Sequence, residues 1–373
     1  MTSKIARVVA WSLAEAHQWL GDRRPPDAAA APGIATRLRD AGAQAVCIVD
    51  AASVAGRSHT WLDTEHACGW LVSAPDAQVA DSGDARRFAS HLGAAMNKGF
   101  VAADAAVLAA MATADGWRVN DPAQLPRLSW SEQARFADAV VAHPGRLDLY
   151  AIVDGVDRLQ QVLATGVKTV QLRIKTPGQP APGWHDTLRS EVRRSVEASV
   201  AAGAELFVND HWQIAAEAGA YGVHLGQEDL LALGDAGRAA LQATGMALGV
   251  SSHSLWELCR AGALAPRYIA CGPVWPTLTK AMPWRAQGLD NLAWWCRMAP
   301  APVVAIGGIL GTEQVEQAAR CGADGICIVR GLGVRPETIV PSLQAAMRAG
   351  RASAGRPGAA PEWPHPSLAP DRG

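Results

Sequence analysis

Eight short apolar runs, each followed by an amphipathic helical segment, occupy the chain from residue 147 onward. This alternation is typical of parallel strands joined by helices. Eight consecutive strand–helix units predict an α/β fold of the (β/α)₈ TIM-barrel type rather than an open doubly wound sheet. The predicted strands are 147–154, 169–175, 205–210, 222–226, 247–253, 268–275, 302–309 and 325–330.

Residues 1–140 and 351–373 differ from the predicted barrel at 145–350. The first region has alanine-rich helical segments and one clear strand candidate, at 45–50, which predicts a smaller, separate α/β region. A barrel with a hydrophobic core of its own should fold without the rest of the chain. We therefore expect a fragment beginning near residue 143 to be stable and active. The last residues are rich in Pro, Gly, Ala and Ser and should form a mobile tail.

Charge and cysteine content limit the classes of partner. The net charge of -1 provides no general basic field, so we expect neither nucleic acid nor a membrane as partner, and any anion must be bound by a local cluster. No segment resembles a signal peptide or a membrane span, and the seven cysteines form no C-x-x-C pair. We expect a cytoplasmic protein with reduced thiols that acts on small phosphorylated molecules and that can form a homo-oligomer.

Polar residues gather at the carboxyl ends of the predicted strands, where the active sites of such barrels lie. In the second strand, alternation places Gln171, Arg173 and Lys175 on one face that points into the barrel. Two inward cations and an amide predict an anion site. The alternative, an exposed charged edge, is unfavourable because a closed barrel has no edge strand.

Two carboxylates follow the next two strands. Asn209 and Asp210 end the third strand, and Asp229 follows the fourth. Carboxylates on neighbouring strand ends predict a Mg²⁺ site completed by water and diphosphate oxygens. The alternatives are helix capping for Asp210 and a first-turn dipole partner for Asp229. His224, on the fourth strand, is interpreted as a core residue.

Hydroxyl groups and one lysine follow the fifth and sixth strands. Ser251 could hydrogen-bond a reacting group, whereas Ser254 is expected to cap a helix. Thr277, Thr279 and Lys280 can donate to diphosphate oxygens. Only five of the 34 basic residues are lysines and only four residues are asparagines, which favours a specific role for Lys175, Lys280 and Asn209.

The last two strands predict a second anion site. Gly307 and Gly308 end the seventh strand, and Val329 and Arg330 end the eighth. Barrels of this class commonly bind a phosphate on backbone N–H groups at this place, and a glycine pair lets the main chain approach it closely.

The motifs at these strand ends, taken in order, resemble those of the thiamine-phosphate synthase family. They are QLRIK at 171–175, VND at 208–210, GVHLGQED at 222–229, GVSSHS at 249–254, GPVWPTLTK at 272–280 and AIGGI at 305–309. As a set, spread over about residues 147–335, they are far more specific than any single motif.

The resemblance implies that a pyrimidine diphosphate and a thiazole phosphate are joined to thiamine monophosphate with release of pyrophosphate, with Mg²⁺ as the cofactor. It assigns the diphosphate substrate to Gln171, Arg173, Lys175, Asn209 and Lys280, and the metal to Asp210 and Asp229. It assigns the thiazole phosphate to Thr277, Thr279 and Gly308. Val329 and Arg330 are added to this site because they lie at the end of the eighth predicted strand. Ser251 and Lys280 would act on the departing diphosphate.

Departures from the family pattern leave alternatives open. Leu278 replaces a usual threonine, His211 replaces a frequent arginine and Arg330 stands where Val-Ser is usual. A thiazole tautomerase-like enzyme, or a non-catalytic protein that binds thiamine precursors, are the alternatives. Segments at 42–50 and 81–100 resemble the C-terminal half of hydroxymethylpyrimidine phosphate kinases, and the region is interpreted as a non-catalytic remnant because only one glycine of the anion-binding turn remains.

Overall fold

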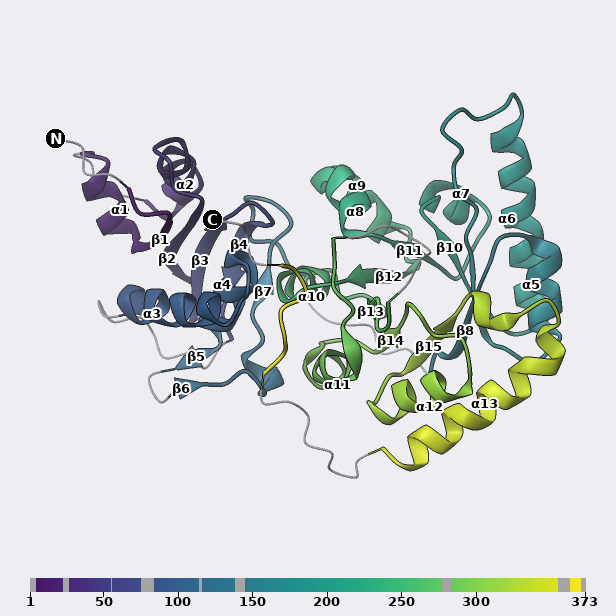
Figure 1. Ribbon diagram of the computed structural model, residues 1–373. Coiled ribbons are helices and arrows are strands. Elements are labelled where there is room, and N and C mark those ends of the chain that lie inside the picture. Colours follow the sequence, from purple (N-terminus) through teal and green to yellow (C-terminus); the bar gives the residue numbers. More distant parts are fainter. Residues whose placement is uncertain are drawn as a thin grey trace.

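The computed structural model describes residues 5–22, 27–54, 56–74, 84–113, 116–137, 145–276, 283–354 and 363–369. It has two domains side by side, an N-terminal α/β domain and a barrel that begins at residue 147 (Figure 1). None of the described helices is long and apolar enough to cross a membrane.

A mixed five-stranded sheet forms the centre of the N-terminal domain, in the order β1-β2-β3-β4-β7. Strands β1 and β2 are parallel and the other pairs are antiparallel. The prediction of one strand in this region was therefore too low, because β3 is mostly polar and β1 and β4 have only five residues each. The strands are β1 (Val8–Ser12), β2 (Ala45–Val54), β3 (Arg57–Asp63), β4 (Cys68–Val72) and β7 (Arg127–Leu128), with a separate hairpin of β5 (Ala112–Thr113) and β6 (Gly116–Trp117).

Helices cover both faces of this sheet, as the alternation along β2 requires. Val46 and Ile48 pack in one cluster with residues of α1 (Leu13–Trp19) and α2 (Ala31–Asp40). Cys47 and Val49 face the other way, into the cluster that holds α3 (Asp84–Asn97) and α4 (Ala102–Ala110). Helices α3 and α4 account for the alanine-rich helical segments expected in this part of the chain. Residues 81–83 of the kinase-like turn lie outside the described residues.

The eight predicted parallel strands are all present and close into a barrel. Strand β15 pairs with β8 from Gly325↔Asp148 to Ile328↔Ala151, which completes the ring. Every strand ends one to four residues before its predicted end, because the last residues of each run belong to the loops. The strands are β8 (Asp148–Val153), β9 (Thr169–Leu172), β10 (Glu205–Asn209), β11 (Gly222–Leu225), β12 (Ala247–Ser252), β13 (Tyr268–Cys271), β14 (Val303–Ala305) and β15 (Gly325–Ile328).

Helices surround the strands, and side chains fill the interior. Tyr150, Phe207 and Tyr268 form the aromatic part of a buried interior cluster. Two strand glycines make room for these rings: a Cβ at Gly249 would lie 2.2 Å from the ring of Tyr268, and one at Gly222 would lie 2.6 Å from Phe207. The helices are α5 (Val156–Leu163), α6 (Trp184–Ala201), α7 (Trp212–Glu217), α8 (Gln227–Ala232), α9 (Gly234–Ala243), α10 (Leu255–Gly262), α11 (Gly288–Met298), α12 (Thr312–Arg320) and α13 (Pro336–Ala352).

The two domains share one apolar core, which the sequence interpretation did not anticipate. A single buried cluster runs from β2 and α4 through Trp130 to α10 and α11 of the barrel. The indole of Trp130 donates to the carbonyl of Arg260, and Arg260 donates to the carbonyl of Cys68. Helix α10 is consequently buried along seven successive residues.

The prediction of a mobile tail is wrong for residues 363–369. This segment lies between the N-terminal domain and the barrel (Figure 1), and Ser367 and Leu368 are buried. The ring of Trp363 lies 4.6 Å from that of Trp117. The prolines and aromatic residues of this segment pack between the two domains. Amino-acid composition alone does not predict such packing.

Candidate functional site at the carboxyl ends of the barrel strands

The predicted site residues follow the strands around one end of the barrel. Residues 277–282, and with them Thr277, Leu278, Thr279 and Lys280, lie outside the described residues. The others can be placed, and their hydrogen bonds and mutual electrostatic effects show which of them meet.

Asp210, Asp229 and Arg173 occupy one neighbourhood. Burial and the nearby Asp229 carboxylate raise the pKa of Asp210, whereas His211 and Arg173 act in the opposite direction. Asp210 itself has a positive φ of 65°, an unusual conformation for a residue other than glycine that turns the chain sharply after β10. The third and fourth strand ends and the segment after β9 thus bring two carboxylates and one guanidinium together.

The alternative roles in helix capping, considered for Asp210 and Asp229, hold for only one of the two carboxylates. His211, and not Asp210, is the N-cap residue of α7, and it makes no side-chain capping bond. Asp229 lies in the first turn of α8 and its Oδ2 accepts a hydrogen bond from Gly226 N at 3.1 Å. Capping therefore does not account for Asp210, and it occupies one oxygen of Asp229. Ser254 is the N-cap of α10, as expected.

Gln171 differs from the predicted arrangement of the second strand. Strand β9 ends at Leu172, so Gln171 is buried inside the barrel whereas Lys175 is exposed beyond the strand end. Gln171 Nε2 donates to the hydroxyl of Tyr150 at 3.1 Å. The predicted alternation from Gln171 through Arg173 to Lys175 is therefore wrong at its end, because β9 stops at Leu172 and Lys175 is exposed.

A chain of buried hydrogen bonds crosses the barrel interior from Gln171 to Ser251. The hydroxyls of Tyr150 and Tyr268 lie 2.7 Å apart. Tyr268 lies 2.8 Å from Nδ1 of His224, and Nε2 of His224 lies 3.0 Å from Oγ of Ser251. His224 is thus a buried, hydrogen-bonded core residue as interpreted, but it also contacts a predicted catalytic residue.

All donors in this series of hydrogen bonds have an acceptor if each residue donates to the next one, from Gln171 towards Ser251. Burial, with smaller effects of Arg173 and His253, lowers the pKa of His224 to about 4, so its ring is neutral near pH 7 and carries one N–H. Because the Gln171 amide donates to Tyr150, the Tyr150 hydroxyl is free to donate to Tyr268, and Tyr268 to His224 Nδ1. His224 Nε2 then donates to Ser251, which leaves the Ser251 hydroxyl proton available to a ligand.

The glycine pair after β14 packs against the end of the sixth strand. Gly307 and Gly308 have φ values of 92° and 73°, and a Cβ on either would lie within 2.6 Å of Pro273 or Trp275. The pair is therefore required by this close approach of the chain, whatever ligand it meets. After the next strand, β15, Val329 is 41% exposed and Arg330 begins a short 3₁₀ turn, so both are accessible to a ligand.

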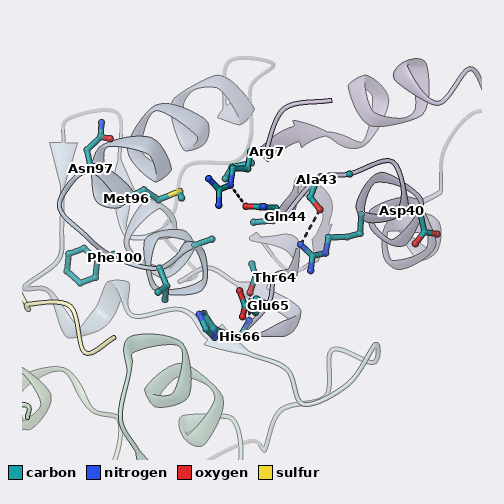
Figure 2. Close-up of a pocket in the computed structure, with 16 residues that line it drawn as sticks. Arg7, Asp40, Ala43, Gln44, Thr64, Glu65, His66, Met96, Asn97 and Phe100 are labelled. Atoms are coloured by element: carbon teal, nitrogen blue, oxygen red, sulfur yellow. Dashed lines mark hydrogen bonds between the residues drawn. The ribbon is translucent and has the colours of Figure 1, made fainter. Parts of the chain in front are cut away.

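A large cavity lies elsewhere, in the N-terminal domain. It has a volume of about 800 Å³ and is lined only by residues between Arg7 and Ala102 (Figure 2). Its charged lining residues have both signs, among them Arg7, Arg39, Asp40 and Glu65. None of the predicted site residues lines it. Sequence reasoning had given no sign of it, because it forms where the beginnings of β1 and β2 meet the junction of α3 and α4.

Comparisons with known proteins match the part of the chain that forms the barrel. Residues 149–332 match the family model described as thiamine monophosphate synthase. A thiamine-phosphate synthase of Rhizobium etli is 44% identical over 194 residues, which are 52% of this chain and 90% of the relative. One from Neisseria meningitidis is 42% identical over 203 residues, which are 53% of this chain and 94% of the relative. A solved thiamine phosphate pyrophosphorylase from Pyrococcus furiosus is 25% identical, covers 55% of this chain and 96% of its own, and superposes with a TM-score of 0.47. On the strength of its curated relatives, the chain belongs to the thiamine-phosphate synthase family.

Proposed function

We propose that the barrel joins hydroxymethylpyrimidine diphosphate to thiazole phosphate, giving thiamine monophosphate and pyrophosphate. The observation that carries the proposal is that Arg173 acts electrostatically both on Asp210, which also interacts with Asp229, and on His224, which is hydrogen-bonded to Ser251. The family motifs run through the same residues in the same order.

Mg²⁺ fits the two carboxylates. Burial and the charge of Asp229 disfavour the ionised form of Asp210, against the opposite effects of His211 and Arg173, so a divalent cation held by both carboxylates would favour their charged forms. We therefore assign the metal to Asp210 and Asp229, with water and diphosphate oxygens as its remaining ligands. When bound, the ion supplies positive charge to the departing diphosphate.

The diphosphate substrate is assigned to Gln171, Arg173, Lys175, Asn209 and Lys280. Arg173 carries a permanent charge and lies beside the carboxylate pair, so it can bind diphosphate oxygens next to the metal. Asn209 is buried at the end of β10, where its amide can donate to the pyrimidine or its diphosphate. Gln171, whose Nε2 is bonded to Tyr150, contributes mainly by fixing the hydrogen-bond chain.

The thiazole phosphate is assigned to Thr277, Thr279 and Gly308 together with Val329 and Arg330. The exposed end of β15 offers a guanidinium to that phosphate. Since Gly307 and Gly308 pack on Pro273 and Trp275, a phosphate at the end of β14 would also be held close to the sixth strand.

Bond cleavage precedes bond formation in the mechanism we propose. The carbon–oxygen bond of the pyrimidine methyl group breaks, and its electron pair leaves with pyrophosphate. Cations around the diphosphate stabilise this charge, and Ser251 can donate a hydrogen bond to it because His224 holds its oxygen as an acceptor. The thiazole nitrogen then forms the carbon–nitrogen bond with the pyrimidine methyl cation, which proximity favours.

The test is to mix the purified protein with both substrates and Mg²⁺ and to measure thiamine monophosphate and pyrophosphate together. Equal amounts of the two products support the proposal. Binding of both substrates without release of pyrophosphate would instead indicate a protein that binds thiamine precursors. Turnover of the thiazole phosphate alone would indicate a tautomerase.

A further inference from the structure

Two fully buried amides, Asn291 and Gln287, connect the C-terminal segment to the barrel. The side chain of Asn291 pairs with the main chain of His365: Oδ1 accepts from His365 N at 2.8 Å, and Nδ2 donates to His365 O at 3.0 Å. Both amides have 0% of their surface exposed. Asn291 is also one of only four asparagines in the chain, and the chemistry of the site does not use it.

Gln287 extends this connection to the ends of two strands that face the site. Its Oε1 accepts from Asn291 Nδ2 at 2.8 Å, and its Nε2 donates to the carbonyl of His253 at 2.7 Å. Its backbone N–H donates to the carbonyl of Pro273 at 2.7 Å. One residue therefore fixes the chain after β12, two residues beyond Ser251, and the chain after β13.

Further contacts hold residues 284–288 between the C-terminal segment and the fifth strand end. Arg285 N donates to Ser367 O at 2.8 Å, and His365 Nε2 lies 2.7 Å from the carbonyl of Gln287. On the other side, the ring of Trp284 stacks on His253 with centroids 5.2 Å apart and planes 11° apart.

The N-terminal domain anchors the same segment. Lys98 lies over the ring of Trp363 at 4.8 Å, and Trp363 packs edge-to-face on Trp117. Residues 363–369 are thus attached to both domains. The attachment on the barrel side ends at the residues that border Ser251.

We propose that residues 363–369 act as a clamp on the active site, and that Asn291 and Gln287 are positioning residues that transmit its hold to His253 and Pro273. The inference rests on the proposed function, since it concerns the geometry in which that reaction occurs. Neither amide touches substrate. They fix the strand ends that do, and small displacements of such groups reduce rates strongly.

The experiment compares the wild-type chain with Asn291→Leu, which keeps the branching and the number of side-chain heavy atoms and removes the hydrogen bonds of the amide. A second variant ends at Ala354 and lacks the clamp while leaving the buried side chains of the barrel unchanged. The control is Gln317→Leu, which removes an amide on α12 that bonds only Glu313 among the described contacts. For each chain, kcat and KM for the pyrimidine diphosphate are measured, together with amide hydrogen exchange of residues 251–256 and 284–288.

Both variants are expected to raise KM and to lower kcat/KM by about tenfold or more, with faster exchange at 284–288, whereas the control stays at the wild-type values. A purely structural role would lower the active fraction without changing KM, and a folded variant with wild-type KM overturns the proposal. If the wild type itself makes no thiamine phosphate, the proposed function fails, and the exchange measurement decides on the clamp separately: unchanged exchange at 284–288 overturns it.

Discussion

The carboxylate of Asp104, in α4 of the N-terminal domain, accepts a hydrogen bond from the backbone nitrogen of Trp256, in the first turn of α10, at 3.1 Å. Asp104 is 1% exposed, and burial raises its pKa to about 7. The N-terminus of a barrel helix is therefore satisfied by a side chain from another domain, three residues after the end of β12.

The first prediction concerns the pH dependence of stability at Asp104. In the unfolded chain this carboxyl has a pKa near 3.8, so between about pH 4 and pH 7 the folded protein binds one proton more. The stabilisation is complete below pH 4 and is lost as the pH rises through 7, by on the order of 4 kcal/mol at most. Asp104→Asn keeps an acceptor oxygen and does not titrate. The Tm of wild type relative to this variant should fall between pH 5 and pH 8, and parallel Tm curves would refute the assignment.

The second prediction revises the expectation that the barrel folds alone. Removing residues 1–142 would expose the face of α10 that Trp130 and α4 cover, and would leave the Arg260 guanidinium without the Cys68 carbonyl. Large exposed apolar patches cause association or misfolding. We expect the fragment to be insoluble or aggregated, as measured by size-exclusion chromatography. A monomeric fragment with the wild-type Tm would show that the shared core adds no stability.

The third prediction tests the metal site. Asp210→Asn and Asp229→Asn should each lower kcat/KM at least tenfold at low Mg²⁺ and raise the Mg²⁺ concentration needed for half-maximal rate, because each removes a charged ligand. The matched control is Glu228→Gln, which removes an exposed carboxylate from the same turn of α8 as Asp229. An equal shift of the Mg²⁺ dependence in the control would mean that general negative charge, and not the pair, governs metal binding.

The strands of the barrel could be predicted from the sequence because each is a buried apolar run with a helix after it. Their ends could not, since the polar residues Arg173 and Lys175 continue an alternation that β9 abandons at Leu172. The sheet of the N-terminal domain was missed for a related reason: β3 (Arg57–Asp63) is stabilised by pairing with strands on both sides and not by its own hydrophobicity.

Of the candidate site, sequence position was enough to bring Asp210, Asp229 and Arg173 together, because parallel strands of a barrel end at the same rim. The partners of Ser251 were not predictable. Tyr150, Tyr268 and His224 look like ordinary interior residues in the sequence, and only their rotamers make them a hydrogen-bonded chain. The hydrogen bonds of Asn291 and Gln287 were likewise not predictable, because their partners, among them His365, are distant in the sequence.

The last prediction concerns how strongly substitutions along the hydrogen-bonded series from Gln171 to Ser251 lower kcat. His224→Phe removes the ring nitrogen that holds Ser251 and should lower kcat by roughly tenfold to a hundredfold with little change in KM, since the lost hydrogen bond acts on the departing charge. Tyr268→Phe leaves His224 in contact with Ser251 but no longer fixes which nitrogen carries the proton, so its effect should be smaller.

Tyr150→Phe acts at the far end of the chain, where the hydroxyl accepts from Gln171. It should retain most of the wild-type kcat, while the unpaired amide of Gln171 costs about 1–3 kcal/mol of stability. Steady-state kinetics and thermal unfolding of the three variants separate the two effects. A kcat that falls equally in all three would mean that packing of the aromatic interior, and not an oriented Ser251 hydroxyl, is what the reaction requires.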